Sequence, residues 1–351
     1  MKELTNSRDK YIDGMRGLAC AVIVLHHYAI WQIPEANNGI ANCINDMLLF
    51  MKMWGGYANA FFFFFSGYLL ALKHKQFDNS SISTFLCKRI KGLWLPLVLN
   101  AIVMFIMNKY TLMHTIRNIL LIHACFFNDG TTPETAWRYE VVGATWFITP
   151  LVICYFLFWI IVKNIKEENR WIAFFLLGLT GAIAYQMGWS FPLVNSLTAY
   201  GLLAFFAGSF FAFIWNRNKV KVRAVPICLL ATALILVALY EMVKGIQIDI
   251  LQSLAVIVLP CLLILGEKGV LLKRIVSNSL FVCLGEISML IWLFHISVRG
   301  LLSKLFMAFN VSVGTYTFLI SYIVVLIIVV YTYKRFDKQI RSLLRKVFLI
   351  Q

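Results

Sequence analysis

Four chemically active side chains lie within one apolar stretch near the start of the sequence. Residues 11–31 are apolar enough to cross a membrane, yet they include Asp13, Arg16, His26 and His27. Because charged and titratable groups are costly at membrane depth, such groups usually face the protein interior and mark a functional pathway. The stretch therefore indicates a functional site.

The spacing predicts that three of these residues share one face of a helix. Arg16 and His27 are eleven residues apart, close to three turns, and Asp13 lies three residues before Arg16. His26 would point about 100° away from this face. With a rise of about 1.5 Å per residue, Arg16 lies roughly 16 Å from His27 along the axis. We predict a polar stripe that joins an anion site to a titratable group.

A second polar stripe is predicted near residues 280–298. Its members follow one another at intervals of four, three and four residues, which places Ser288, Trp292, His295 and Arg299 on one helical face. His295 and Ser288 are candidates for binding an acceptor substrate or for orienting the chemistry. A hydrogen bond between two helices would explain a membrane histidine equally well.

Three cations, Lys88, Arg89 and Lys91, stand at the start of a predicted span. Fixed cations at a helix N-terminus suit a phosphate-bearing ligand. Contact with anionic lipid headgroups would explain such residues as well. We favour a ligand for Arg89, and lipid contact for Lys73 and Lys75 of the preceding loop.

The composition predicts an all-α membrane protein. Of 351 residues, 61% are hydrophobic and 14% charged, and the mean hydropathy is +0.79. A soluble domain of this composition would expose large apolar patches. About ten spanning helices are predicted, with a polar outer loop at 35–56 and a longest outer segment at 109–143. The expected spans are 17–34, 57–72, 92–108, 144–162, 171–188, 196–215, 225–243, 250–266, 280–298 and 315–333.

The net charge of +16 reflects membrane topology and excludes a nucleic-acid partner. With the N-terminus inside, 25 of the 32 Lys and Arg residues fall in inner segments. Arg299 is one of the seven on the outer side. This asymmetry follows the positive-inside rule and predicts cytoplasmic N- and C-termini.

Two further residues are candidates for contact with a substrate. Ser66 interrupts the aromatic run of the second span, where helix packing alone would also explain it. Trp146 opens the fourth span at the depth that indoles favour. The eight cysteines show no zinc-site spacing, so we expect no metal, and a disulfide between Cys43 and Cys125 stays open.

Five stretches together resemble the acyltransferase-3 family of integral membrane acyltransferases. They are IDGMRGLA at 12–19 with His27 eleven residues after Arg16, FFFFSGYLL at 62–70, FLCKRIKGLWLP at 85–96, WFI at 146–148, and LGEIS at 284–288 with WLFH at 292–295. The pair Phe336-Asp337 resembles the family's closing motif, which more commonly ends in Glu. Gly92 departs from the pattern, because an arginine is common there, and Lys91 stands beside it.

The resemblance implies transfer of an acyl group, usually acetyl, from cytoplasmic acyl-CoA to a hydroxyl of a cell-envelope carbohydrate or lipid-linked glycan. Arg16, Arg89, Lys88 and Lys91 would hold the donor's phosphates. His27 would act as general base or carry the acyl group covalently, and Asp13 would orient Arg16. Acyl-CoA is a substrate, and no permanently bound cofactor is expected.

The resemblance also implies a location in the bacterial cytoplasmic membrane. We expect residues 1–351 to form one membrane domain without an appended soluble domain. The alternative function is a transporter or flippase, in which Arg16, His27 and His295 would line a substrate path. No internal repeat supports that alternative.

Overall fold

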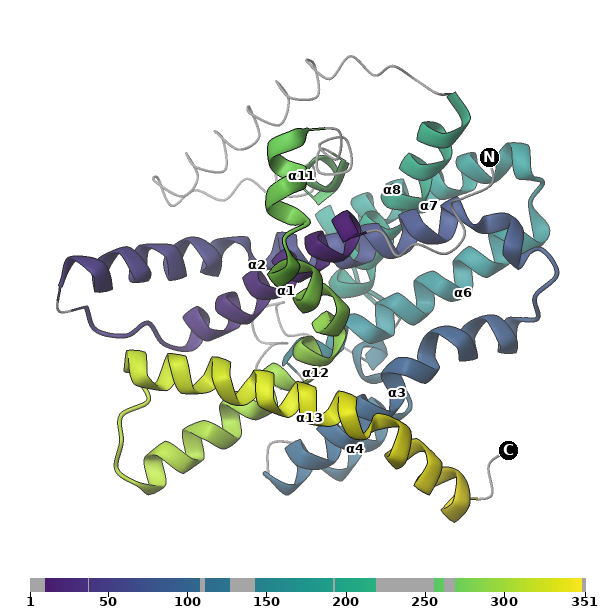
Figure 1. Ribbon diagram of the computed structural model, residues 1–351. Coiled ribbons are helices and arrows are strands. Elements are labelled where there is room, and N and C mark those ends of the chain that lie inside the picture. The colour runs from purple at the N-terminus through teal and green to yellow at the C-terminus, as the bar shows by residue number, and fades with distance from the viewer. Residues whose placement is uncertain are drawn as a thin grey trace.

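The computed structural model describes residues 10–36, 38–107, 111–126, 143–191, 193–218, 256–261 and 269–348. This part of the chain is a bundle of α-helices with short 3-10 segments and one two-residue antiparallel ladder (Figure 1). The α-helices are α1 (Lys10–Trp31), α2 (Gly39–Leu72), α3 (Ile82–Ile106), α4 (Leu112–Ile119), α6 (Ile148–Asn164), α7 (Arg170–Gln186), α8 (Ser196–Asn218), α11 (Val270–Val276), α12 (Ser279–Ala308) and α13 (Tyr316–Phe348). The 3-10 helices are η1 (His74–Phe77), η2 (His123–Phe126), η3 (Gly143–Phe147) and η4 (Glu167–Asn169), and the strands are β1 (Ser190–Phe191) and β2 (Val194–Asn195).

The helices confirm an all-α membrane protein. Among the described residues, α3, α6, α8, α12 and α13 contain stretches long and apolar enough to cross a membrane, and α2 is a sixth if its two bent halves form one span. The expected spans at 225–243 and 250–266 lie largely outside the described residues. Helices α1 and α7, which cover most of the expected spans 17–34 and 171–188, are not among these candidates. The number of ten spans and the orientation of the termini therefore stay predictions.

The polar outer loop expected at 35–56 is wrong for most of its length. Helix α2 begins at Gly39, where the side chain of Asn38 accepts a hydrogen bond from the backbone N–H of Ala41. Asn45 donates to the carbonyl of Pro34 and accepts from the Tyr316 hydroxyl. The asparagines that suggested a loop thus cap and anchor a helix.

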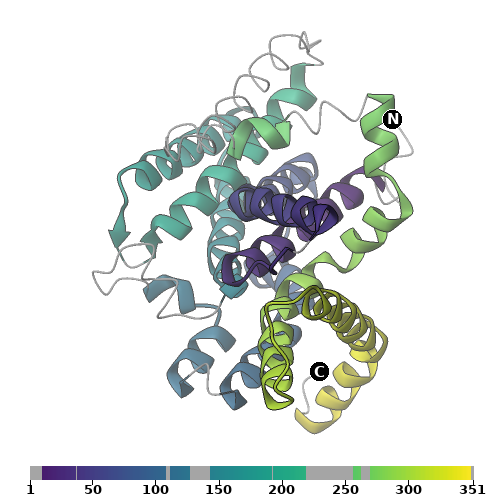
Figure 2. The same ribbon diagram turned by 90° about the vertical axis from the view of Figure 1, so that its left-hand side faces the viewer.

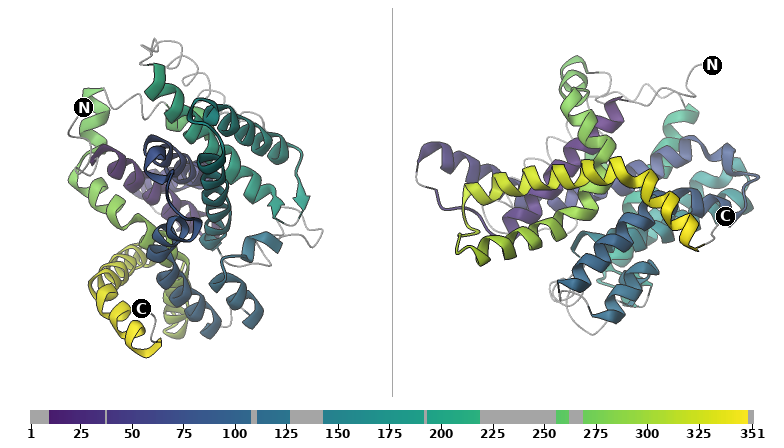
Figure 3. Two further views of the ribbon diagram at one scale, coloured as in Figure 1. Left: turned by 90° about the vertical axis from the view of Figure 1, so that its right-hand side faces the viewer. Right: turned by 60° about the horizontal axis from the view of Figure 1, so that its bottom comes forward.

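Helices α1 and α12 form the centre of the fold and run parallel to each other. α1 also packs on α2, which in turn packs on α8, and α7 covers α8 on the outside (Figures 1 and 3). α13 lies beside α12 (Figure 2). The two helices that carry the predicted polar stripes are therefore neighbours, although about 270 residues separate them in sequence.

Glycines allow the close approach of α1 and α12. A Cβ atom on Gly17 would overlap the carbonyl oxygen of Phe281, and one on Gly285 would overlap the carbonyl oxygen of Asp13. Backbones that meet through small residues are typical of membrane helix pairs. This contact fixes the register of the two helices.

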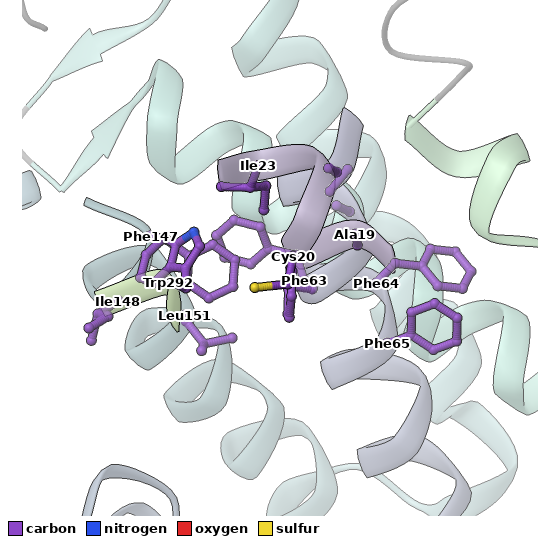
Figure 4. Close-up of a cluster of buried hydrophobic side chains, with 14 of the residues drawn as sticks. Ala19, Cys20, Ile23, Phe63, Phe64, Phe65, Phe147, Ile148, Leu151 and Trp292 are labelled. Carbon is purple, nitrogen blue, oxygen red and sulfur yellow. The ribbon is translucent and has the colours of Figure 1, made fainter. Parts of the chain in front are cut away.

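An aromatic cluster packs against the centre of this helix pair. Phe63 and Phe147 have ring centroids 4.1 Å apart, and Phe147 meets Trp292 edge to face at 4.9 Å. Figure 4 shows these rings beside Cys20 of α1. The cluster joins α2, η3 and α12 into a rigid wall around α1.

Candidate active site

The structure brings the two predicted polar stripes together at His27 and His295. Nδ1 of His27 lies 3.2 Å from Nε2 of His295, and the ring centroids are 4.9 Å apart. His27 is 5% exposed and His295 is fully buried. The hydrogen bond between helices that the sequence left open for His295 therefore exists, and its partner is the candidate catalytic histidine.

The hydrogen bonds around these rings determine which nitrogen of each neutral imidazole carries the proton. Nδ1 of His295 lies 2.7 Å from the carbonyl oxygen of Trp292, which can only accept, so this nitrogen donates. Nε2 of His295 then accepts from Nδ1–H of His27, which also points at the carbonyl of Ile23 at 3.0 Å. Nε2 of His27 therefore keeps its lone pair and can accept a proton or attack a carbonyl carbon.

His26 faces a different neighbour, as the helical spacing predicted. Its Nδ1 approaches the carbonyl oxygen of Lys52 on α2 at 2.6 Å, and its ring covers Gly55. The rings of His26 and His27 are almost perpendicular, with an interplanar angle of 80°. His26 therefore joins α1 to α2, while His27 faces α12.

At the other end of the α1 stripe lie two cations, Arg16 and Arg89, which we call the cationic corner. Arg16 and Asp13 form an ion pair at 3.6 Å, with Arg16 about a third exposed and Asp13 buried. The hydroxyl of Tyr155 on α6 lies within electrostatic range of both Arg16 and Arg89, and it is hydrogen-bonded to Ser66. Ser66 of α2 and Arg89 of α3 therefore meet at Tyr155 of α6, and the charge of Arg16 on α1 also acts on this hydroxyl.

Arg89 is held by aromatic rings. Its guanidinium carbon lies 4.8 Å from the ring centroid of Phe85, 5.0 Å from Phe77 and 6.0 Å from Tyr155. Stacking fixes the planar group while leaving its N–H donors for an anion. Lys88 and Lys91, in contrast, are exposed at the surface of α3.

The remaining predicted residues lie in packed surroundings. The Ser288 hydroxyl donates to the carbonyl of Gly285, and the Ser288 carbonyl accepts from the Cys20 thiol. Trp146 is 6% exposed and packs 6.2 Å from Phe63, so it lies inside the bundle and not at its surface. Ser288 and Trp146 are therefore packed inside the bundle.

Both cysteines considered for a disulfide are free. Cys43 is exposed on α2, whereas Cys125 is buried in η2. The disulfide left open by the sequence is therefore absent.

Sequence reasoning missed Tyr155. It lies in an apolar run of α6 that offers no polar pattern, so only its hydrogen bond with Ser66 and its position beside Arg89 distinguish it. It also missed that Trp31 and Arg299 extend the α1–α12 contact, with the guanidinium 4.2 Å from the indole centroid.

A family model described as an acyltransferase domain matches residues 9–334, nearly the whole chain. The chain belongs to the acyltransferase-3 family. Family membership identifies it as a membrane acyltransferase, as the sequence motifs suggested. No curated protein and no solved structure matched the chain.

Proposed function

We propose that this acyltransferase-3 protein moves an acyl group, normally acetyl, from acyl-CoA to a hydroxyl of a cell-envelope carbohydrate or lipid-linked glycan. The observation that carries the proposal is the hydrogen-bonded pair of His27 and His295, reached along α1 from the cationic corner. The protein would act in the bacterial cytoplasmic membrane, with the donor entering from the cytoplasm.

The cationic corner suits the phosphates of the donor. Arg16 is partly exposed beside Asp13, and Arg89 is held flat by Phe77 and Phe85. Charge-assisted hydrogen bonds from guanidinium groups to phosphate oxygens are among the strongest available. Lys88 and Lys91 would add long-range attraction from the surface of α3.

The distance along α1 suits the shape of an acyl-CoA. Eleven residues separate Arg16 from His27, which is roughly 16 Å along the helix axis. Acyl-CoA carries its thioester at the end of a long flexible arm, away from the phosphates. Phosphates bound at the corner would therefore leave the thioester free to reach His27.

At the proposed reaction centre, Nε2 of His27 would remove the proton from the acceptor hydroxyl while the hydroxyl oxygen attacks the thioester carbonyl. The C–S bond then breaks, and the thiolate of CoA takes the proton back from His27. His295 would hold the His27 ring in the tautomer whose Nε2 is basic. On the second route, the same lone pair would attack the thioester carbonyl, and the C–S bond would break with release of the CoA thiolate. The acceptor hydroxyl would then attack this acyl-imidazole, the N–C bond to Nε2 would break, and the hydroxyl proton would pass to the thiolate.

The proposal is tested with purified protein in nanodiscs, radiolabelled acetyl-CoA and cell-envelope extract as acceptor. Release of CoA with transfer of label to glycan, lost in His27→Ala, is the expected result. Label retained on the wild-type enzyme before acceptor is added would assign the acyl-imidazole route. If the wild type neither binds nor consumes acetyl-CoA under these conditions, the proposed reaction is wrong.

A further inference from the structure

One turn beyond the histidine pair, the contact of α1 with α12 continues as an arginine on an indole. The pairs Cys20–Ser288, His27–His295 and Trp31–Arg299 share one register, because the partners in each are 268 positions apart. The Arg299 guanidinium lies 4.2 Å from the Trp31 ring centroid, and Trp31 is 44% exposed. The Trp31–Arg299 end of the helix pair is therefore exposed to solvent, whereas the histidine pair is buried.

Arg299 lacks a protein counter-charge within the described residues. No carboxylate pairs with it there, and its Nε atom is buried without a hydrogen-bond acceptor. A half-buried guanidinium in this state has lost water at Nε without gaining a hydrogen-bond acceptor, and the Trp31 ring supplies neither an acceptor atom nor a counter-charge. An anion bound from outside the chain would supply both the acceptor and the charge.

Two buried hydroxyls add donors to the same place. The Tyr28 and Tyr322 side chains are fully buried and stack with ring centroids 6.0 Å apart. Neither hydroxyl has a hydrogen-bond partner in the described part of the chain. Tyr28 lies three residues before Trp31 on α1, so its ring neighbours the indole that contacts Arg299. Unsatisfied buried polar groups that gather beside a cation indicate a missing ligand.

We propose that Arg299, Tyr28, Tyr322 and Trp31 form a subsite for an anionic group, a carboxylate or a phosphate, on the sugar acceptor. Arg299 would bind the anion, with the tyrosine hydroxyls as further donors, and the exposed Trp31 ring would pack on the sugar's apolar face. This subsite rests on the proposed acyl transfer to a carbohydrate.

The position of the subsite fits an acceptor and not the donor. Arg299 and Trp31 lie four residues beyond His295 and His27, about 6 Å along the helices. An anion held there would place a hydroxyl of the same sugar beside Nε2 of His27. Arg16, in contrast, lies on the opposite side of the histidine pair.

Binding of three sugars in nanodiscs of zwitterionic lipid, without acyl-CoA, tests the subsite. Glucuronate carries a carboxylate, glucose 1-phosphate carries a phosphate, and glucose carries neither. The wild type should bind at least one anionic sugar about tenfold or more tighter than glucose, a difference of about 1.4 kcal/mol. The anionic sugar that binds more tightly identifies the anion as a carboxylate or a phosphate. Arg299→Gln should remove this preference, and Arg299→Lys should keep part of it.

The matched control is Lys304→Gln, which removes a cation from the same end of α12. The Lys304 ammonium donates to the backbone carbonyl of Met107, so the preference for anionic sugar should persist in this variant. Acetyl-CoA affinity should be unchanged in Arg299→Gln. His27→Ala should keep the preference for anionic over neutral sugar, because that ratio depends on Arg299, so the subsite is measured even if the proposed acyl transfer fails.

Three results would overturn the subsite. One is an equal preference for anionic sugar in wild type and Arg299→Gln. Another is a loss of acetyl-CoA binding in Arg299→Gln, which would make Arg299 a donor contact. The third is equal binding of all three sugars combined with a dependence of thermal stability on anionic lipid that Arg299→Gln abolishes. That result would assign the site to a lipid headgroup.

Discussion

Nδ1 of His27 and Nε2 of His295 face each other at 3.2 Å across the parallel helices α1 and α12. The carbonyl oxygen of Trp292 accepts a hydrogen bond from Nδ1 of His295, so Nε2 of this neutral ring carries no proton. The proton positions of both neutral rings follow from that one carbonyl. In this arrangement His295 resembles the residue that orients the base in a catalytic triad, although here it is an imidazole and not a carboxylate.

His295 should affect the rate of the chemical step more than the binding of substrates. In His295→Phe the hydrogen bond to His27 is lost while the site stays filled, so kcat should fall about 10- to 100-fold at nearly constant KM. His295→Gln offers an amide oxygen that can accept from His27, and it should recover part of kcat. Steady-state kinetics of both variants test this. Equal activity in wild type and His295→Phe would show that His295 serves packing alone.

Alanine substitutions of His27 and His26 should differ sharply in their effect on turnover. Removing a general base should lower turnover by about 10²- to 10⁴-fold, so His27→Ala should be almost inactive. His26→Ala loses only a contact with the backbone of α2 and should keep most activity. CoA release at saturating acetyl-CoA, with thermal unfolding as a check on folding, compares the two. Equal losses in well-folded variants would contradict the assignment of the two faces of α1.

The cationic corner should determine donor affinity. Arg16→Gln and Arg89→Gln each remove a charge-assisted contact, and each should weaken acetyl-CoA binding about tenfold or more. Arg89→Lys should also bind weakly, because an ammonium cannot stack between Phe77 and Phe85 as a guanidinium does. The exposed Lys73 is the control, and Lys73→Gln should bind normally. Calorimetry in detergent measures the acetyl-CoA affinity of the wild type and of the four variants.

Close packing of α1 on α12 should be sensitive to a single methyl group. Gly17→Ala places a Cβ against the carbonyl of Phe281, and overpacking of this kind costs about 1–3 kcal/mol. A displaced helix would also separate His27 from His295, so activity should fall together with stability. Gly92→Ala is the control, since a Cβ there meets nothing within 4 Å. A Gly17→Ala variant as stable and active as wild type would refute the tight register.

The sequence predicted each polar stripe but not their contact. Helical spacing alone groups Asp13, Arg16 and His27, because the period of a helix is local information. The pairing of His27 with His295 depends on which helices pack together and in which register. The glycines that set this register, Gly17 and Gly285, are visible in the sequence, but their partners are backbone carbonyls that no residue pattern reveals.

The same limit explains the errors in the fold. An asparagine can end a loop or cap a helix, and Asn38 does the second because α2 continues through Asn45 to its anchor on Tyr316. Tryptophan is common at the membrane–water interface, yet Trp146 packs against the rings of Phe63 and Phe147 inside the bundle. In both cases tertiary contacts decide between two local possibilities.

A buried histidine away from the histidine pair should make stability depend on pH. His123 in η2 is 1% exposed, with Nε2 donating to the carbonyl of Thr145 at 2.8 Å. Burial lowers the pKa of His123 to about 4, although this hydrogen bond opposes the shift. Below pH 6.5 the unfolded chain binds a proton here that the folded chain does not, so acid favours unfolding.

Between about pH 6.5 and pH 4, this one group should remove up to about 3 kcal/mol of stability, near 1.4 kcal/mol for each pH unit. His123→Gln keeps an amide donor for Thr145 but cannot bind the proton, so its stability should vary less with pH over this window. Thermal unfolding in detergent at pH 7.5, 6.0 and 5.0 compares the variant with wild type. Parallel curves for the two proteins would show that His123 is protonated equally in the folded and unfolded states.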